Sequence, residues 1–137
     1  MIYITRRERF NAAHRLYRED FDDRKNFEVF GKCSNPNWHG HNYELFVTVK
    51  GDINPQTGFL VNLTDLKQII REKITNKLDH KNLNTEVDFL NGKFTSTEVL
   101  CKSIWEQLED EVSCLGAKLH KVKVIETENN FVEYYGE

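Results

Sequence analysis

The feature that most constrains the fold is a pair of consecutive amphipathic helical segments with no strand-like segment between them. The first is predicted over about 62–78 and the second over about 95–112, because apolar residues recur there at helical spacing. The stripes are Leu66, Ile69, Ile70, Ile74 and Leu78 in the first helix, and Leu100, Ile104, Leu108 and Val112 in the second. A parallel βαβ unit needs a strand between its helices. The order therefore predicts an α+β fold, an antiparallel sheet with helices on one face.

Alternating apolar and polar residues predict strands on both sides of the helices. We expect strands over 2–14, 39–50, 121–127 and 131–135, and a short strand at 59–61. The apolar faces of the first two are Ile2, Ile4, Phe10, Ala12 and His14, then Tyr43, Leu45, Val47 and Val49.

The segments between these elements have the character of turns and caps. Residues 17–37 are polar and of mixed charge, which predicts a loop. Asn62 or Thr64 is expected to cap the first helix, and Thr95 has capping-box spacing to Glu98 at the start of the second.

Composition limits the class of protein. A chain of 137 residues is expected to form a single domain over 1–137. A net charge of -3 and the lack of basic runs argue against a nucleic-acid partner, and no stretch approaches the roughly 18 apolar residues of a membrane span. Three widely spaced cysteines predict no disulfide framework and a reducing, cytoplasmic setting.

The sharpest local feature is His39-Gly40-His41 at the start of a predicted strand. Residues i and i+2 of a strand project from the same face, so both imidazoles can reach one ion. His14 ends the first strand on its apolar face and can supply a third nitrogen. Three nitrogen ligands with an open fourth position are typical of catalytic zinc. Two alternatives stay open: histidines that bind no metal, and a closed structural site with Cys33 as fourth ligand.

Cys33 lies in the polar segment, six residues before His39. A partly exposed thiol whose pKa is lowered by Lys32 or by a nearby metal is a usable base or nucleophile. The alternative is an inert buried cysteine, which is the interpretation that we favour for Cys101 and Cys114.

Two further groups can take part in acid–base or ligand chemistry. Asp79 can orient His80 as a proton relay, although a histidine after a helix is also explained by the helix dipole. Glu126 stands on an otherwise apolar strand face. It is either solvent-facing at the strand end or a buried acceptor for a ligand edge with two N–H donors.

Taken together, seven segments resemble, in order, the motifs of the 6-pyruvoyl-tetrahydropterin synthase and 6-carboxytetrahydropterin synthase family. They are FNAAH at 10–14, GKCSNPNWHGHNY at 31–43, NPQTG at 54–58, NLTDLK at 62–67, LDHKNL at 78–83, STE at 96–98 and KVIETE at 123–128. The resemblance covers nearly the whole chain.

The resemblance implies a zinc-dependent lyase that acts on 7,8-dihydroneopterin triphosphate and needs no redox cofactor. By position, it implies zinc ligands at His14, His39 and His41, a catalytic set of Cys33, Asp79 and His80, and pterin contacts at Glu126, Thr97 and Glu98. It also implies the tunnelling fold (T-fold), a four-stranded antiparallel sheet with two helices on one face. Such chains assemble into barrels, usually hexamers of two stacked trimers, with sites at subunit interfaces.

The two branches of the family differ in product. The expected reaction is triphosphate elimination to give 6-pyruvoyl-tetrahydropterin for biopterin synthesis, and the gap of five residues between Cys33 and His39 resembles that branch. The segment 96–105 looks at least as much like the carboxy branch, which releases acetaldehyde and leads to 7-deazaguanine bases such as queuosine. A non-catalytic pterin- or zinc-binding homologue and a zinc hydrolase are the alternatives of other classes. Lys32 and Arg15 are candidate phosphate contacts, although plain surface charge is the favoured interpretation.

Overall fold

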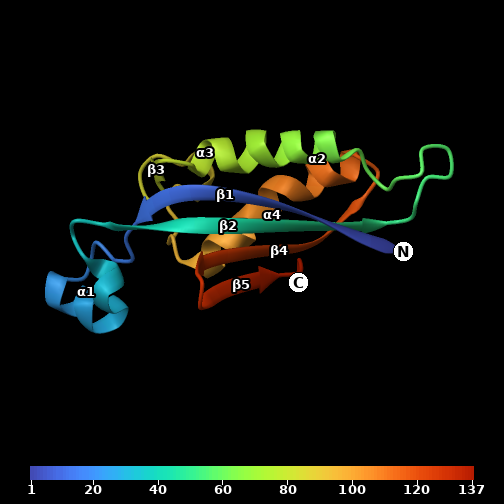
Figure 1. The fold of residues 1–137 in the computed structure, drawn as a ribbon. Coiled ribbons are helices and arrows are strands. Elements are labelled where there is room, and N and C mark those ends of the chain that lie inside the picture. The colour runs from blue at the N-terminus through green and yellow to red at the C-terminus, as the bar shows by residue number, and fades with distance from the viewer.

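The computed structural model describes residues 1–137, and its architecture is a sheet covered on one face by helices (Figure 1). β1 (Ile2–His14) and β2 (His39–Gly51) pair antiparallel along their whole length. With β3 (Lys81–Asn82), β4 (Lys118–Thr127) and β5 (Asn130–Tyr134) they form a five-stranded sheet in the order β3-β1-β2-β4-β5. All neighbours are antiparallel except β1 and β3, which are parallel.

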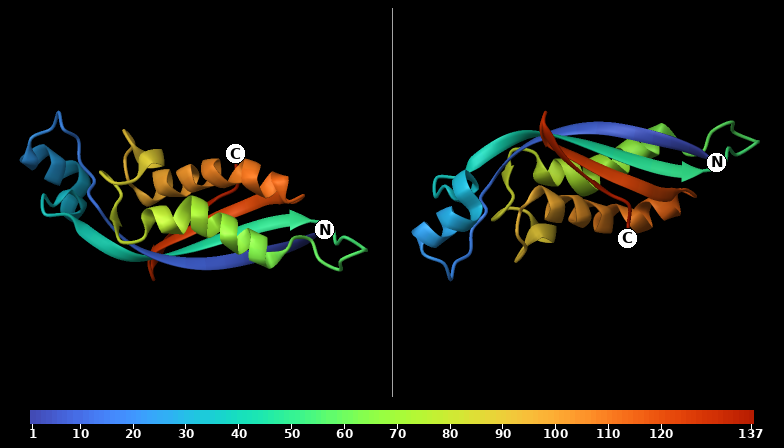
Figure 2. Two further views of the ribbon diagram at one scale, coloured as in Figure 1. Left: turned by 90° about the horizontal axis from the view of Figure 1, so that it is seen from above. Right: turned by 90° about the horizontal axis from the view of Figure 1, so that it is seen from below.

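One layer of helices covers the apolar face of this sheet. α2 (Leu63–Ile70), a π-helical turn η2 (Arg71–Thr75) and α3 (Asn76–Leu78) run on from one another, and α4 (Thr97–Cys114) lies beside them on the same face (Figure 2). The predicted stripes are buried throughout, with only Ile69 partly exposed. They join the inner face of the sheet in one core of 25 residues, so the predicted α+β fold is confirmed.

The polar segment between β1 and β2 is not a simple loop. It contains α1 (Asp23–Phe30) and the 3₁₀ turn η1 (Gly31–Ser34), which project beyond the end of the sheet (Figure 1). Asp22 starts α1 by accepting a hydrogen bond from the Lys25 amide at 2.7 Å. Because α1 buries only Asn26, it has no apolar stripe, and the sequence pattern gave no sign of a helix.

Four smaller expectations were wrong. The segment 59–61 is a bend, because Leu60 and Val61 fill the core without pairing to a strand. The sheet has five strands, since β3 pairs with only two residues of β1 and is too short to show a pattern. Ser96, not Thr95, caps α4, and Cys114, expected to be buried, is exposed at the end of that helix.

A further 3₁₀ turn, η3 (Asp88–Leu90), precedes α4. None of the helices is long and apolar enough to cross a membrane.

Candidate active site

The three predicted histidines form one cluster on the inner face of the sheet. His14 and His39 are directly opposite each other in the β1–β2 ladder, and His41 follows on the same face of β2. The ring centroids are 4.5 Å apart for His14 and His39, 5.2 Å for His14 and His41, and 5.0 Å for His39 and His41. One nitrogen of each ring lies within 4.8 Å of the other two, so the histidines are positioned to bind a metal ion.

The hydrogen bonding of these rings fits a cation. His14 Nε2, His39 Nδ1 and His41 Nε2 are buried and have no hydrogen-bond partner. Buried polar atoms without partners are costly, and a shared metal ion would satisfy all three. Burial lowers the pKa of each of the three histidines, which keeps the rings neutral and able to ligate.

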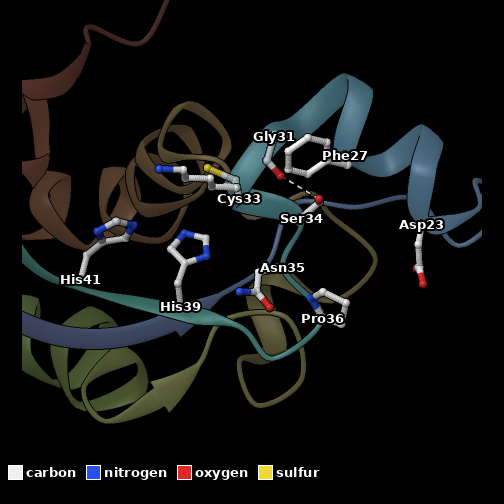
Figure 3. Close-up of a pocket in the computed structure, with 10 residues that line it drawn as sticks. Asp23, Phe27, Gly31, Cys33, Ser34, Asn35, Pro36, His39 and His41 are labelled. Carbon is white, nitrogen blue, oxygen red and sulfur yellow. Dashed lines mark hydrogen bonds between the residues drawn. The ribbon is translucent and has the colours of Figure 1, made fainter.

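Cys33 faces this cluster from η1 (Figure 3). It lines a cavity of about 640 Å³ together with His39 and His41. The Ser34 hydroxyl closes the turn by donating to the Gly31 carbonyl at 2.8 Å. Burial raises the pKa of the Cys33 thiol, and the Glu126 carboxylate raises it further. The expected lowering by Lys32 is therefore not found. A cation bound to the histidines would lower the pKa of this thiol.

Glu126 stands on the other side of Cys33. A second cavity of about 440 Å³ is lined by Cys33, Thr97, Glu98 and Glu126 among others, so Cys33 lines both cavities. The Thr97 hydroxyl donates to the Glu126 carboxylate, whose other oxygen lies 3.7 Å from His41 Nε2. Glu126 is thus an inward-facing acceptor at a cavity. Glu126 lies on β4 and Thr97 in the first turn of α4, so the fold brings together two residues that are far apart in the sequence.

Tyr43 adjoins the histidine cluster, whereas its strand position predicted only a core residue. Its hydroxyl is buried without a hydrogen-bond partner, and its ring centroid lies 5.5 Å from that of His41. Burial raises the pKa of Tyr43, so the hydroxyl stays protonated. Its nearness to the cluster could have been predicted from the sequence, because Tyr43 is on the same strand face as His39 and His41.

Asp79 and His80 form the predicted pair, but the pair lies on the surface away from the two cavities of Cys33. The Asp79 carboxylate lies 2.9 Å from His80 Nδ1 and accepts a hydrogen bond from the Asn11 amide at 2.8 Å. This amide holds the pKa of Asp79 below its usual value. The His80 amide donates to the Asn11 carbonyl, and His80 adopts a positive φ of 59°. The pair sits beside β1 and β3, lines neither cavity, and leaves the His80 side chain 82% exposed.

The candidate phosphate contacts differ in their surroundings. Lys32 lines the cavity that contains Cys33. The Arg15 guanidinium instead donates to the Ser34 carbonyl at 2.8 Å and stacks over the Tyr17 ring at 4.1 Å. Arg15 therefore serves to hold η1 against the end of β1.

Comparisons with known proteins agree with these features. The family model described as 6-pyruvoyl tetrahydropterin synthase matches residues 3–137. The 6-pyruvoyl tetrahydrobiopterin synthase of Homo sapiens is 48% identical over 134 residues, covering 98% of this chain and 91% of that protein. The 6-carboxy-5,6,7,8-tetrahydropterin synthase of Bacillus subtilis is 32% identical over 129 residues, covering 90% of this chain and 78% of that protein.

The fold is shared as well. The solved structure of Caenorhabditis elegans 6-pyruvoyl tetrahydropterin synthase superposes with a TM-score of 0.90 at 34% identity, covering 99% of this chain and 96% of that one. The match extends over the sheet, both long helices and the segment that carries Cys33. The chain belongs to the 6-pyruvoyl tetrahydropterin synthase family.

Proposed function

We propose that this chain is a zinc-dependent lyase that converts 7,8-dihydroneopterin triphosphate to 6-pyruvoyl-tetrahydropterin with elimination of triphosphate. The observation that carries the proposal is the cluster of three unpartnered, buried histidine nitrogens beside the cavity of Cys33. Family membership and 48% identity to a 6-pyruvoyl tetrahydrobiopterin synthase support the reaction class. The lower identity to the carboxy enzyme, 32%, favours the pyruvoyl product.

In this proposal His14, His39 and His41 hold the zinc, which when bound supplies Lewis-acid polarisation of the substrate's side-chain hydroxyls. Cys33 is the base that takes a proton from the adjacent side-chain carbon as the triphosphate leaves. His80, oriented by Asp79, exchanges protons with the reacting side chain.

The pterin ring binds in the second cavity, the one lined by Glu126. The Glu126 carboxylate can accept two N–H groups from the guanidine-like edge of the ring. The Thr97 hydroxyl already donates to this carboxylate and holds it in place, and Glu98 lines the same cavity. Because Cys33 lines both cavities, a ring anchored at Glu126 directs its side chain toward the thiol and the histidines.

We further propose that the catalytic set is completed between copies of the chain, in a hexamer of two stacked trimers. The cavity that Cys33 shares with Glu126 is lined by residues of β4 and β5. Asp79 and His80 are instead exposed beside β1 and β3, at the opposite edge of the sheet. β1 pairs with β3 over two residues only, and β5 has one neighbour, so both edges offer strands for pairing.

Product analysis tests this function. The zinc-loaded protein is incubated with 7,8-dihydroneopterin triphosphate, and pterins, triphosphate and acetaldehyde are measured by mass spectrometry and chemical assay. We expect triphosphate and 6-pyruvoyl-tetrahydropterin without acetaldehyde. Acetaldehyde with 6-carboxytetrahydropterin would assign the chain to the carboxy branch, and release of neither product would identify a non-catalytic homologue.

A further inference from the structure

The residue that follows the first metal-binding histidine is held by an asparagine from a distant part of the chain. The Arg15 amide donates to Asn84 Oδ1 at 3.0 Å, and Asn84 Nδ2 donates to the Arg15 carbonyl at 2.9 Å. One residue before Asn84, the Leu83 amide donates to the carbonyl of Ala13, two residues before Arg15, at 2.8 Å. The Asn84 side chain thus continues the pairing of β1 with β3 past His14, where no strand partner remains.

The same asparagine also binds Thr95, the residue whose carbonyl orients His14. The Thr95 hydroxyl donates to Asn84 Oδ1 at 2.9 Å, and the Thr95 carbonyl accepts a hydrogen bond from His14 Nδ1 at 2.7 Å. Thr95 and His14 are both at most 1% exposed. His14, Arg15, Asn84 and Thr95 therefore form a closed ring of contacts, and we refer to these four residues as the His14 clamp.

We propose that Asn84 is a positioning residue for the metal centre. It fixes Thr95 relative to the end of β1, and the Thr95 carbonyl in turn keeps the His14 proton on Nδ1 and leaves Nε2 for the metal. Partners of this kind, which bind the second nitrogen of a ligating histidine, commonly change metal affinity by about 10–100-fold. The inference rests on the metal site of the proposed function and adds a residue whose side chain is outside the histidine cluster.

The alternative role for this region is ordinary capping of α4, and the contacts argue against it. Ser96, not Thr95, caps the helix by accepting from the Val99 amide. The Thr95 hydroxyl is consequently free for Asn84, and its carbonyl is free for His14. Loss of the Asn84 side chain would leave the Arg15 amide without a partner. The Thr95 hydroxyl and the Arg15 carbonyl would keep only the longer hydrogen bond between them, at 3.4 Å.

Zinc affinity, measured by competition with a chromophoric chelator, tests the clamp. Asn84→Ala should weaken zinc binding about tenfold or more and broaden the visible spectrum of the cobalt-substituted protein. Asn84→Asp keeps an oxygen that accepts from Arg15 and Thr95 but loses the donor to the Arg15 carbonyl, so it should weaken zinc binding less than Asn84→Ala does. Asn62→Ala is the matched control: it removes the same side chain from the cap of α2, where Asn62 accepts from the Thr64 amide, and lies outside the clamp.

The outcomes separate a positioning role from a structural one. If Asn84→Ala and Asn62→Ala both lower the melting temperature but bind zinc equally well, the inference is overturned. Should Asn84→Ala fail to fold, Thr95→Val removes the hydroxyl link with the backbone carbonyl retained; weaker zinc binding supports the clamp and unchanged binding contradicts it. Wild-type protein that binds no zinc would overturn the metal site itself, a result distinct from equal binding by all variants.

Discussion

At the scale of single residues, the histidine cluster and its neighbour Tyr43 contain four polar atoms that are buried without a hydrogen-bond partner. They are three histidine nitrogens and the Tyr43 hydroxyl. Each costs stability in the absence of a ligand, and sites of catalysis are where such costs are commonly found. The residue types were predictable from the sequence, because His14, His39 and His41 share strand faces. Their pairing opposite one another was not, since it depends on the register of β1 with β2.

The histidine cluster predicts how stability of the metal-free protein depends on pH. Burial lowers the folded-state pKa of all three from the ordinary value of 6.5. Below that value the unfolded chain binds more protons than the folded one, so the free energy of unfolding should fall as the pH drops from about 6.5 toward about 5. Urea denaturation of chelator-treated protein measures this slope, and a His39→Gln variant should show a shallower one. A flat profile in this range would contradict the burial of neutral rings.

Tyr43 gives a second prediction at this scale. Tyr43→Phe removes a buried hydroxyl that has no partner, so the metal-free protein should lose no stability and can gain up to about 1 kcal/mol. Thr48→Val is the matched control, because the Thr48 hydroxyl is hydrogen-bonded to that of Thr5 at 2.8 Å, and its removal should cost about 1 kcal/mol. Chemical denaturation of both variants makes the comparison. Equal losses would show that Tyr43 has a partner in solution.

At the scale of elements, the prediction succeeded where a pattern extends over many residues. The long strands and both amphipathic helices have enough repeats to define a period, and their buried faces were correct. α1 and β3 escaped prediction for opposite reasons: α1 buries almost nothing, and β3 is too short. The predicted cap of α4 was one residue too early, because Thr and Ser are adjacent there and only their contacts distinguish them. Ser96 accepts from the Val99 amide, whereas Thr95 donates to Asn84.

The cap assignment can be tested by stability. Ser96→Ala should lower the free energy of unfolding by about 1 kcal/mol, because the Val99 amide loses its acceptor. Ser113→Ala, in the exposed last turn of the same helix, should change it much less. Urea denaturation of both variants measures the two changes in the free energy of unfolding. Equal effects of the two substitutions would argue against Ser96 as the cap.

At the scale of the whole molecule, the proposed catalytic set is divided between two edges of one sheet. Cys33 adjoins the histidines and Glu126, whereas Asp79 and His80 are bonded to Asn11 beside β1. The sequence predicted the members of this set through the family resemblance, but no local pattern tells which edge each one reaches. That placement follows from the strand order β3-β1-β2-β4-β5.

Sharing of the site between copies predicts complementation. Cys33→Ala and His80→Ala should each be inactive as homo-oligomers, and mixed oligomers reassembled from the two should regain part of the wild-type turnover, since some sites combine an intact Cys33 with an intact His80. Activity of the reassembled mixture, against each variant treated alone, is the measurement. A mixture as inactive as its components would place the whole set within one chain.

In the proposed reaction, a metal on three histidines and the Cys33 thiol act together in triphosphate elimination. Triphosphate release from 7,8-dihydroneopterin triphosphate by zinc-loaded Cys33→Ala, with the zinc content of the same sample determined, tests it most directly. We expect one zinc per chain, as in wild type, and a loss of turnover of at least about 100-fold. Undiminished release would indicate a zinc hydrolase independent of the thiol, and loss of the zinc would indicate a closed site with Cys33 as a ligand; either result would contradict a joint role of metal and thiol.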